Sequence, residues 1–495
     1  MSYLGISAGF HDASITVIDN DGNITFAGHS ERYSKQKNDH TLNEEIFNDA
    51  KIGCVSDIAY YEKPLLKQLR QLYQGAGIDW SQVTTHQMLS KAIPPIARRT
   101  IGTGIRTKSY PHHKSHAAAG FQTSPYDRAT VVVIDAIGEF DTITIWGAEY
   151  NSKGYAKYKK LWSQGYPHSM GLFYSAMTQR VGLKPNEDEY ILMGMAAYGV
   201  PDYNVFDEFV LDRDTIRFRN NLHVGCEDWE TDLSEFNIAA SAQYTIEVLL
   251  HSVMNKAREL NWSKNLVYMG GVALNCSANE HIGAYFDNIW IMPNPGDAGS
   301  SLGAAALSYG RKVNWQHPFL GTNIPGDYPV NALLDELLTK KIVGVASGRA
   351  EFGPRALGNR SLLADPRGKE IKDQVNEIKR RQKFRPFAPV ILEEYVNDYF
   401  IMPEGFRESP YMQVVARLQN PDAYPAVVHA DGTSRVQTVP ANSTCGIRQL
   451  LEKWFILTGC PMLLNTSLNI KGKPMVNNRD DADEFEKLYG VKVCS

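Results

Sequence analysis

The sequence has few cysteines and no long apolar run. Its six cysteines, among 495 residues, are scattered without a Cys-x-x-Cys pair. This spacing excludes a disulfide framework and indicates reduced thiols in a cytosolic compartment. No apolar stretch approaches the roughly 18 residues that a membrane-spanning helix needs, and the N-terminus lacks the positive segment and apolar core of a signal peptide. We therefore expect a soluble cytoplasmic protein with no membrane partner.

An excess of charge of one sign is also lacking. The chain has 51 Lys and Arg residues against 55 Asp and Glu residues, a formal net charge of −4. This balance excludes a protein that binds nucleic acid through overall charge, although a local basic groove stays open. The 43% of hydrophobic and 21% of charged residues exclude global disorder. The length suffices for two to four domains.

Two similar strand–turn–strand units are present in the first half of the chain. Apolar or β-branched runs at residues 3–7, 15–18 and 24–28 flank a polar turn at residues 20–23, a pattern typical of a hairpin. Runs at residues 131–134 and 142–146 form a comparable unit around a Gly- and acid-containing turn. An internal duplication and two unrelated hairpins both explain this spacing.

The pattern becomes alternating α/β between residues 266 and 308. One predicted strand enters Gly270-Gly271, and the next enters a turn that ends at Gly296-Asp297. Such turns, followed by helix N-termini, can hold phosphate through backbone N–H groups and indicate a nucleotide site. Residues 311–330 are rich in Pro, Gly and Asn and are the best linker candidate. A second α/β segment begins with the strand-like residues 342–346.

The sharpest local signal is a pair of histidines four residues apart. On a helix, His112 and His116 share a face and can hold one metal ion, whereas the simpler interpretation is two surface histidines. Asp135 and Asp297 can add carboxylates, and such a set suits iron(II), manganese or zinc without choosing among them. His11, in the first turn, is either a general base or a residue that caps backbone groups.

Basic residues are concentrated in the second half, from residue 349 to residue 385. Arginines interleaved with Gly and Pro suit bidentate phosphate or carboxylate binding, and the alternative is a structural ion-pair network. Near the end, Asn465 and Ser467 offer small polar groups for a ligand. A further basic stretch at residues 98–108 either contacts a nucleic-acid backbone or forms a solvated loop.

Together these motifs resemble those of the O-carbamoyltransferases of nodulation-factor, cephamycin and tobramycin biosynthesis, over essentially the whole chain. The longest match, residues 351–361, is very specific, whereas the histidine pair alone is not. The segments that carry the resemblance are Gly9-Phe10-His11-Asp12-Ala13-Ser14, His112-His113-Lys114-Ser115-His116-Ala117, Gly270-Gly271-Val272-Ala273-Leu274-Asn275, Gly296-Asp297-Ala298-Gly299, Glu351-Phe352-Gly353-Pro354-Arg355-Ala356-Leu357-Gly358-Asn359-Arg360-Ser361, Phe384-Arg385-Pro386-Phe387-Ala388-Pro389 and Asn465-Thr466-Ser467.

The resemblance implies an α/β fold with two domains. Residues 1–325 would form an actin-like ATPase domain, a duplicated ribonuclease H-like fold, and residues 326–495 an α+β domain similar to threonylcarbamoyl-adenylate synthase, with the last segment free to pack back on the first domain. The second domain would join carbamoyl phosphate to ATP, supplied with Mg²⁺, giving carbamoyl-adenylate and pyrophosphate. The first would pass the carbamoyl group to an acceptor hydroxyl and release AMP.

The resemblance also assigns roles to residues. His112, His116, Asp135 and Asp297 would be the metal ligands, with iron(II) as the expected ion, and His11 would deprotonate the acceptor. Nucleotide binding is implied for Gly270, Gly271, Asn275, Asn279 and Gly296. Binding of carbamoyl phosphate and ATP is implied for Arg349, Arg355, Lys383, Arg385, Asn465 and Ser467, with Arg355 catalytic. The chain departs from the family at Ala136, where Gly is usual, and at Ile191, where Lys is usual.

The acceptor stays open in the sequence. It is either a small-molecule or sugar hydroxyl or 5-hydroxymethylcytosine in DNA, as in viral base modification. The compact length for the family, the Tyr- and Asn-rich composition and the basic stretch at residues 98–108 keep DNA among the alternatives. The rival functions are a nucleotide-binding sensor without turnover and a sugar kinase-like ATPase of the same N-terminal fold. A homodimer is also among the expected assemblies.

Overall fold

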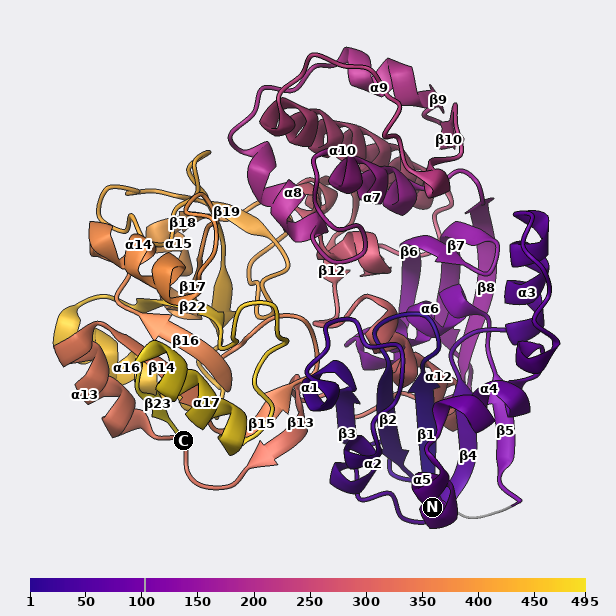
Figure 1. Ribbon diagram of the computed structural model, residues 1–495, viewed down its shortest axis with the longest axis horizontal. Helices are drawn as coiled ribbons and strands as arrows, with labels where there is room; N and C mark the ends of the chain where they lie inside the picture. Colours follow the sequence, from indigo (N-terminus) through magenta and orange to yellow (C-terminus); the bar gives the residue numbers. More distant parts are fainter. Residues whose placement is uncertain (102–103) are drawn as a thin grey trace.

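The computed structural model describes residues 1–101 and 104–495. Figure 1 shows an N-terminal unit, coloured indigo to magenta, beside a C-terminal unit in orange and yellow. Within the described part of the chain, no helix combines the length and apolar character needed to cross a membrane. The six cysteines are all free.

The first half of the N-terminal unit is built on a sheet in the order β3-β2-β1-β4-β5. β1 pairs antiparallel with β2 and parallel with β4. The predicted polar turn is held by the Asp19 carboxylate, which accepts bonds from the backbone N–H groups of Asp21 and Asn23 at 2.9 and 2.8 Å. The strands are β1 (Ser2–Ser7), β2 (Ser14–Asp19), β3 (Ile24–His29), β4 (Val55–Tyr60) and β5 (Arg106–Ser109), and the helices are α1 (Glu31–Ser34), α2 (Glu44–Asp49), α3 (Pro64–Tyr73), α4 (Thr85–Ala92), α5 (Pro95–Ile101) and α6 (His112–Thr123).

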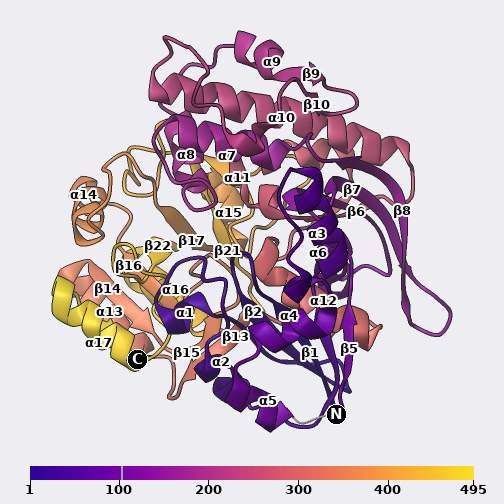
Figure 2. The same ribbon diagram turned by 45° about the vertical axis from the view of Figure 1, so that its right-hand side comes forward.

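The second half repeats this topology. Its sheet has the order β8-β7-β6-β11-β12, with β6 antiparallel to β7 and parallel to β11. The long helix α10 packs on α7 and α8 over this half (Figure 2). The elements are β6 (Arg128–Gly138), β7 (Asp141–Tyr150), β8 (Ala156–Gly165), α7 (Met170–Arg180), α8 (Glu189–Ala196), α9 (Asn204–Phe209), β9 (Val210–Asp212), β10 (Arg217–Phe218), α10 (Glu235–Glu259), β11 (Asn265–Met269), α11 (Cys276–Asn279), β12 (Asn288–Trp290) and α12 (Ser300–Tyr309).

The repeated strand order and directions confirm the internal duplication over two unrelated hairpins. Together the two halves form the predicted duplicated ribonuclease H-like, actin-like fold. The helix that ends each half, α6 or α12, packs against the other between the sheets. Small residues permit this close approach, since a Cβ added to Gly303 would lie 1.8 Å from the Ser115 carbonyl oxygen.

The C-terminal unit is α+β, as predicted. Its main sheet has the order β21-β17-β22-β16-β14-β23 and mixes parallel with antiparallel pairs. A smaller sheet joins β18, β19 and β20. The elements are α13 (Val330–Lys340), β14 (Ile342–Ala346), β16 (Arg360–Ala364), α14 (Lys369–Ile378), β17 (Ala388–Leu392), α15 (Val396–Tyr399), β18 (Phe400–Ile401), β19 (Val415–Leu418), β20 (Thr433–Arg435), β21 (Gln437–Val439), α16 (Gly446–Thr458), β22 (Met462–Ser467), α17 (Arg479–Tyr489) and β23 (Val493–Cys494).

The predicted linker at residues 311–330 contains a strand, β13 (Phe319–Ile324), which pairs antiparallel with β15 (Gly348–Glu351). This two-stranded sheet therefore crosses the predicted boundary at residues 325 and 326, which stays a prediction. The last segment also touches the N-terminal unit, through an ion pair between Lys35 and Asp481. Short 3₁₀ helices complete the fold: η1 (Trp80–Gln82), η2 (Leu222–Val224), η3 (Gly271–Leu274), η4 (Ile282–Tyr285), η5 (Asp297–Gly299) and η6 (Glu393–Tyr395).

Candidate active site

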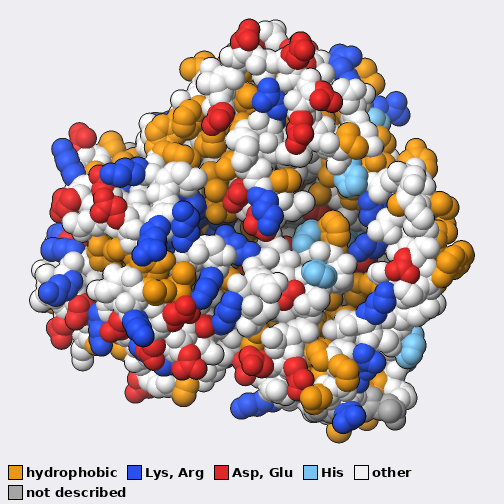
Figure 3. Space-filling model, viewed as in Figure 1, with side chains coloured by type: hydrophobic (Ala, Val, Ile, Leu, Met, Phe, Trp, Pro, Cys, Tyr) orange, Lys and Arg blue, Asp and Glu red, His pale blue; other side chains and the backbone are white. Residues whose placement is uncertain are grey.

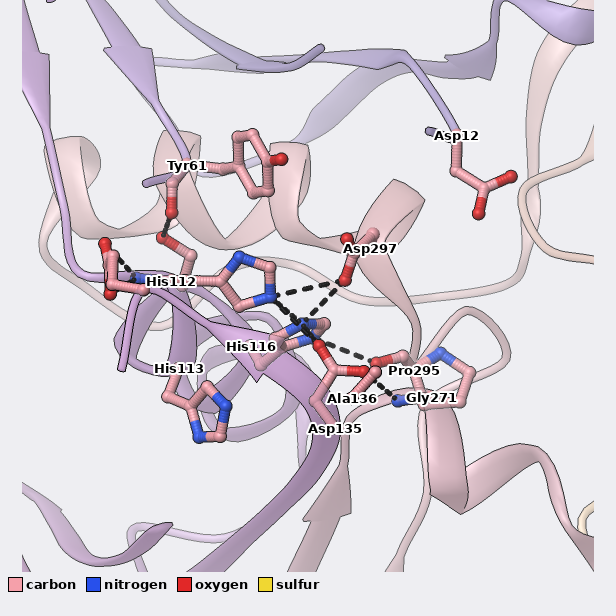
Figure 4. A network of polar contacts seen from close by, with 12 residues as sticks. Asp12, Tyr61, His112, His113, His116, Asp135, Ala136, Gly271, Pro295 and Asp297 are labelled. Atoms are coloured by element: carbon pink, nitrogen blue, oxygen red, sulfur yellow. Dashed lines mark hydrogen bonds and ion pairs between the residues drawn. The ribbon is translucent and has the colours of Figure 1, made fainter. Parts of the chain in front are cut away.

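Two histidines and two aspartates converge at the centre of the N-terminal unit (Figure 4). His112 and His116 lie one turn apart on α6, Asp135 lies near the end of β6, and Asp297 begins η5. One ligand atom from each side chain lies within 4.8 Å of every other, and all four residues are buried. The two halves of the duplicated fold therefore bring together residues that are far apart in the sequence.

The distances within this His/Asp cluster are short. The His112 Nε2 atom lies 3.0 Å from Asp135 Oδ2 and 3.3 Å from Asp297 Oδ1. The His116 Nε2 atom lies 3.3 Å from the same Asp135 oxygen and 3.2 Å from the same Asp297 oxygen. The two Nε2 atoms are 3.0 Å apart. Four potential metal-ligand atoms, two imidazole nitrogens and two carboxylate oxygens, thus face a common centre.

The hydrogen bonds behind this cluster determine what faces the centre. His116 Nδ1 lies 3.0 Å from the Pro295 carbonyl oxygen. A carbonyl only accepts, so Nδ1 carries a proton, and in the neutral imidazole Nε2 presents a lone pair to the centre. The other oxygen of Asp135, Oδ1, accepts from the backbone N–H of Gly271 at 3.2 Å, which orients that carboxylate.

Two buried carboxylates need a compensating positive charge. Burial disfavours protonation of His112, but the charges of Asp297 and Asp135 outweigh it and raise the pKa well above its usual value. The pKa of His116 is raised for the same reason. Two imidazole nitrogens and two carboxylate oxygens, oriented from behind, also form a donor set that fits a divalent cation. The residues present therefore fit the metal that the sequence predicts.

His11 lies beside this cluster and is partly accessible. Its Nε2 atom is 3.6 Å from Asp297 Oδ2, and its Nδ1 atom is 2.9 Å from Asp12 Oδ2. Asp12 adopts a positive φ of 53° and lies apart from the four converging side chains (Figure 4). Burial lowers the pKa of His11, but Asp297 and Asp12 outweigh this and raise it to about 9. One ring nitrogen is thus held by Asp12 and the other faces the cluster.

The glycine turn beside the cluster requires its glycine. Gly270 has a φ of 93°, and an added Cβ would lie 2.1 Å from the Ile134 carbonyl oxygen. A Cβ on Gly296 would instead find only Leu274, at 3.9 Å. Gly271 is occupied in holding Asp135, as described above, so not every N–H group of this turn is free for phosphate.

The two predicted nucleotide-binding asparagines have structural partners. Asn275 caps α11 by accepting from the Ala278 N–H at 3.0 Å, and its amide donates to Gln243 at 2.9 Å. Asn279 is fully buried, and its amide donates at 2.9 Å to the carbonyl oxygens of Ala273 and Gln413. Their binding of a nucleotide stays a prediction.

A second cluster, of four arginines, lies where the C-terminal unit meets the N-terminal unit. Arg355 reaches across to donate to the Leu274 carbonyl oxygen at 3.1 Å, and its charge repels that of Arg435. Arg381 is repelled by Arg385 and Arg435. Burial and this repulsion lower the pKa of Arg355 and of Arg381, each to about 9. None of the four pairs with a carboxylate within the described residues.

Side chains with unbalanced positive charge and planar donors suit a phosphorylated ligand. Figure 3 shows Lys, Arg and His side chains gathered around the hollow between the two units. We call the set Arg355, Arg381, Arg385 and Arg435 the arginine cluster. Arg435 was not singled out in the sequence, because an isolated arginine in a short strand carries no motif.

Two protein-family models match this chain. A family described as carbamoyltransferase N-terminus matches residues 2–306, and one described as carbamoyltransferase C-terminus matches residues 334–493. The chain belongs to the carbamoyltransferase family. It is therefore a transferase, as the sequence motifs indicate.

Relatives of this carbamoyltransferase include proteins from several bacteria. An uncharacterized protein of Synechocystis sp. is 33% identical, covering 97% of this chain and 93% of that protein. The nodulation protein NolO of Bradyrhizobium diazoefficiens is 32% identical, covering 75% of each chain. Component A of the (R)-2-hydroxyglutaryl-CoA dehydratase of Acidaminococcus fermentans, a solved structure, is 14% identical with a TM-score of 0.34. It covers 62% of this chain and 98% of that one, a likeness too weak to argue from.

The remaining residues predicted to bind carbamoyl phosphate and ATP are not all brought together. In this carbamoyltransferase Arg349 donates to the carbonyl oxygens of Thr25 at 2.7 Å, Gly321 at 3.2 Å and Leu320. Arg349 thus joins β3 to β13, and these contacts involve no member of the arginine cluster. Lys383 is largely exposed and lies 4.0 Å from Glu377.

Asn465 and Ser467 lie on β22, close to an amine that the sequence did not single out. Asn465 donates to the carbonyl oxygen of Ala356 at 3.0 Å and to Gln437 at 2.7 Å. The buried Lys379 contacts the Ser467 hydroxyl at 3.3 Å. Burial, together with Arg381 and Arg385, lowers the pKa of Lys379 well below its usual range. Lys379 therefore extends the positive region toward β22.

The two departures from the family lie in different surroundings. Ala136 is half-buried, and its carbonyl oxygen accepts from the Ser169 hydroxyl at 2.7 Å. Ile191, on α8, is buried in the hydrophobic core of the second half, so the missing lysine charge is replaced by apolar packing. The preceding residue, Tyr190, faces the arginine cluster instead, with the Arg385 guanidinium 4.8 Å from its ring centre.

Proposed function

We propose that this carbamoyltransferase uses its two clusters for two successive reactions. At the arginine cluster, water cleaves carbamoyl phosphate to carbamate and inorganic phosphate; a carbamate oxygen then bonds to the α-phosphorus of ATP, which gives carbamoyl-adenylate and releases pyrophosphate. The carbamoyl group then passes to an acceptor hydroxyl at the His/Asp cluster. The observation that carries this proposal is the presence of two chemically different sites, a buried His/Asp cluster and a half-buried arginine cluster, each suited to one step.

The arginine cluster supports the first reaction. Carbamoyl phosphate and the triphosphate of ATP, supplied with Mg²⁺, are both polyanions, and planar guanidinium groups bind phosphate oxygens in pairs. Arg355 and Arg381 are charges that burial and mutual repulsion make costly, and a bound polyanion relieves that cost. Arg355 also contacts Leu274, directly after the glycine turn, so it joins the two sites.

The residues around His11 support the second reaction. A divalent ion bound by His112, His116, Asp135 and Asp297 would polarise the carbamoyl carbonyl. That ion would also offset the Asp297 charge that raises the pKa of His11, so that Nε2 can take the proton of the acceptor hydroxyl while Asp12 holds Nδ1. The hydroxyl oxygen forms a bond to the carbamoyl carbon, the bond from that carbon to the phosphate oxygen breaks, and AMP leaves.

The acceptor in this proposal is a hydroxyl of a small molecule or sugar. A hydroxymethylated base in DNA stays an untested alternative, and the basic stretch that suggested it has internal partners. Arg106 and Lys108 both contact the buried Asp57 carboxylate, at 2.5 and 2.7 Å. Gly102 and Thr103 of that stretch lie outside the described residues. The intact donor set of the His/Asp cluster argues against a sensor without turnover.

A carbamoyl-transfer assay tests the proposal. The protein is loaded separately with iron(II), manganese or zinc, and pyrophosphate release is measured with ATP, with and without carbamoyl phosphate. We expect release that depends on carbamoyl phosphate, followed by transfer of labelled carbamoyl to a panel of hydroxyl compounds. A rate of pyrophosphate release that is the same with and without carbamoyl phosphate would contradict the adenylation step.

A matched pair of variants tests the metal. His113 is adjacent to His112 on α6, but its Nδ1 atom contacts the Thr144 hydroxyl at 3.0 Å and not the cluster. We expect His116→Ala to lower metal affinity at least about tenfold and His113→Gln to leave it unchanged, as measured by titration against a chelator. Equal affinities in both variants would contradict the ligand assignment.

A further inference from the structure

Helix α3 turns its polar side toward the protein and its apolar side toward solvent. Its polar residues Lys67, Gln68 and Arg70 face inward and are 9%, 4% and 8% exposed. Its leucines, by contrast, are among the exposed large hydrophobic residues of the chain: Leu65, Leu66, Leu69 and Leu72. A surface helix normally turns its apolar side to the core. The inner side of α3 therefore serves a purpose other than core packing.

The first turn of α3 adjoins the His/Asp cluster. The backbone N–H of Lys63 donates to Glu139 Oε1 at 2.6 Å, and the same carboxylate accepts from the backbone N–H of His112 at 3.1 Å. The Lys67 ammonium lies 5.2 Å from the ring centre of Phe10, and that ring lies 4.6 Å from the ring of His11. The inner side of α3 thus stands next to the proposed general base.

The far end of α3 reaches the second half of the N-terminal unit. The Tyr73 ring meets the Tyr166 ring edge-on at 6.3 Å, and the Gln74 amide lies 3.4 Å from His223 Nδ1. Figure 1 shows α3 at the outer right edge of this unit. The helix therefore spans from one half of the duplicated fold to the other.

Arg70 is a buried cation without a carboxylate partner of its own in the described chain. Its guanidinium donates to the Gln74 side-chain oxygen at 3.0 Å, and its Nε atom is buried with no partner. The two carboxylates whose charges act on Arg70 have other partners. Glu62 accepts from Lys67 at 2.7 Å, and Glu139 accepts from the backbone amides described above. A buried N–H group without an acceptor is costly, and a bound anion satisfies it.

We propose that the inner side of α3 is the acceptor-binding wall, and that Arg70 binds a negatively charged group on a hydroxylated ring compound. This inference rests on the proposed transfer at the His/Asp cluster and names the acceptor class. Phe10 is 57% exposed and offers a ring face on which a sugar or heterocycle packs. The carboxylate or phosphate of such an acceptor then binds the Arg70 guanidinium, while the acceptor hydroxyl faces His11.

Three probes of one ring type test this inference on the metal-loaded enzyme: glucose, glucuronate and glucose 6-phosphate. Carbamoyl transfer is measured for each, and binding is measured by calorimetry. We expect kcat/KM for a charged probe to exceed that for glucose by at least about tenfold. In Arg70→Met this preference should disappear through a higher KM, and Arg70→Lys should restore part of it. Leu69→Gln, on the outer side, is the matched control and should change neither value.

Pyrophosphate release without an acceptor is measured in the same samples, and it should be equal in the unmodified enzyme and in the Arg70 and Leu69 variants. Absence of pyrophosphate release in the unmodified enzyme would contradict the proposed function. A change in acceptor preference with unchanged pyrophosphate release bears only on the role of Arg70. An enzyme that neither binds nor carbamoylates the charged probes better than glucose contradicts the inference. So does glucose 6-phosphate binding that survives Arg70→Met and is lost in Arg355→Met, since that places the anion at the arginine cluster.

Discussion

Replacing Arg349 by methionine should weaken the fold rather than the chemistry. The guanidinium donates to the carbonyl oxygens of Thr25, Leu320 and Gly321, which ties β13 and β15 to the first half of the N-terminal unit. Methionine retains part of the packing volume but leaves these carbonyl oxygens without their donor. The change therefore separates a structural arginine from the phosphate-binding role that the sequence motif suggests.

The magnitude follows from these bonds. A hydrogen bond to a charged group contributes about 1.5–3 kcal/mol, but Arg349 is partly exposed, and water replaces some of the loss. We expect a total of about 2 kcal/mol. With an unfolding entropy of about 2.1 cal/mol/K per residue, Tm falls by about 2 °C if the whole chain unfolds together, and by about 6 °C if residues 326–495 unfold separately.

Scanning calorimetry and pyrophosphate release per folded protein measure the two effects. Arg355→Met is the control, because burial and Arg435 lower the pKa of Arg355 and its charge therefore opposes folding. We expect that variant to keep or raise Tm and to lose pyrophosphate release. If Arg349→Met keeps its Tm but loses pyrophosphate release at least about a hundredfold, Arg349 binds substrate and the structural reasoning is wrong.

Two further predictions concern packing and pH. Gly303→Ala should push α12 away from α6, since the new Cβ would meet the Ser115 carbonyl oxygen at 1.8 Å; both Tm and metal affinity should fall, and unchanged calorimetry would refute this. Glu394→Gln should lower Tm at pH 7, because Glu394 accepts from Arg448 at 2.7 and 2.8 Å, which lowers its pKa. That stabilisation is present above the ordinary glutamate pKa of about 4.3 and is lost as pH falls through the lowered value. The Tm values of the unmodified protein and of Glu394→Gln should therefore converge as the pH is decreased. A Tm difference that stays constant with pH would contradict the pairing.

Local patterns predicted much of the fold. The strand–turn–strand units depend on short-range signals, such as the turn around Asp21 and Gly22, so both were recognisable. Spacing placed His112 and His116 on one face of α6, and the structure brings Asp135 and Asp297, which the sequence also predicted as ligands, beside them. The duplication itself needed the sheet order, because two similar hairpins do not specify how their strands pair.

The roles of single polar residues were less predictable, because they depend on tertiary contacts. Asn275 and Arg349 have the residue types expected of ligand-binding groups, yet their donors are used by Gln243 and by backbone carbonyl oxygens. Arg435 joins the arginine cluster only through folding. In α3 the periodicity alone would turn the leucines inward, and only the structure shows that Arg70 faces in.

The arrangement also suggests why two sites are joined through Arg355. In the proposed function, carbamoyl-adenylate formed at the arginine cluster has to reach the His/Asp cluster, and Arg355 contacts Leu274, directly after the glycine turn beside that cluster. The His/Asp cluster is buried, and in the proposed function this limits hydrolysis of the reactive intermediate by water. The proposed function thus places adenylation on one set of residues and transfer on the other.

Separating the two half-reactions tests this central claim most directly. Pyrophosphate release with carbamoyl phosphate and ATP, and carbamoyl transfer from synthetic carbamoyl-adenylate, are measured side by side in His116→Ala and Arg355→Met. We predict that His116→Ala retains pyrophosphate release and loses transfer, and that Arg355→Met loses pyrophosphate release and retains transfer. If both variants lose only transfer, the division between the two sites is contradicted.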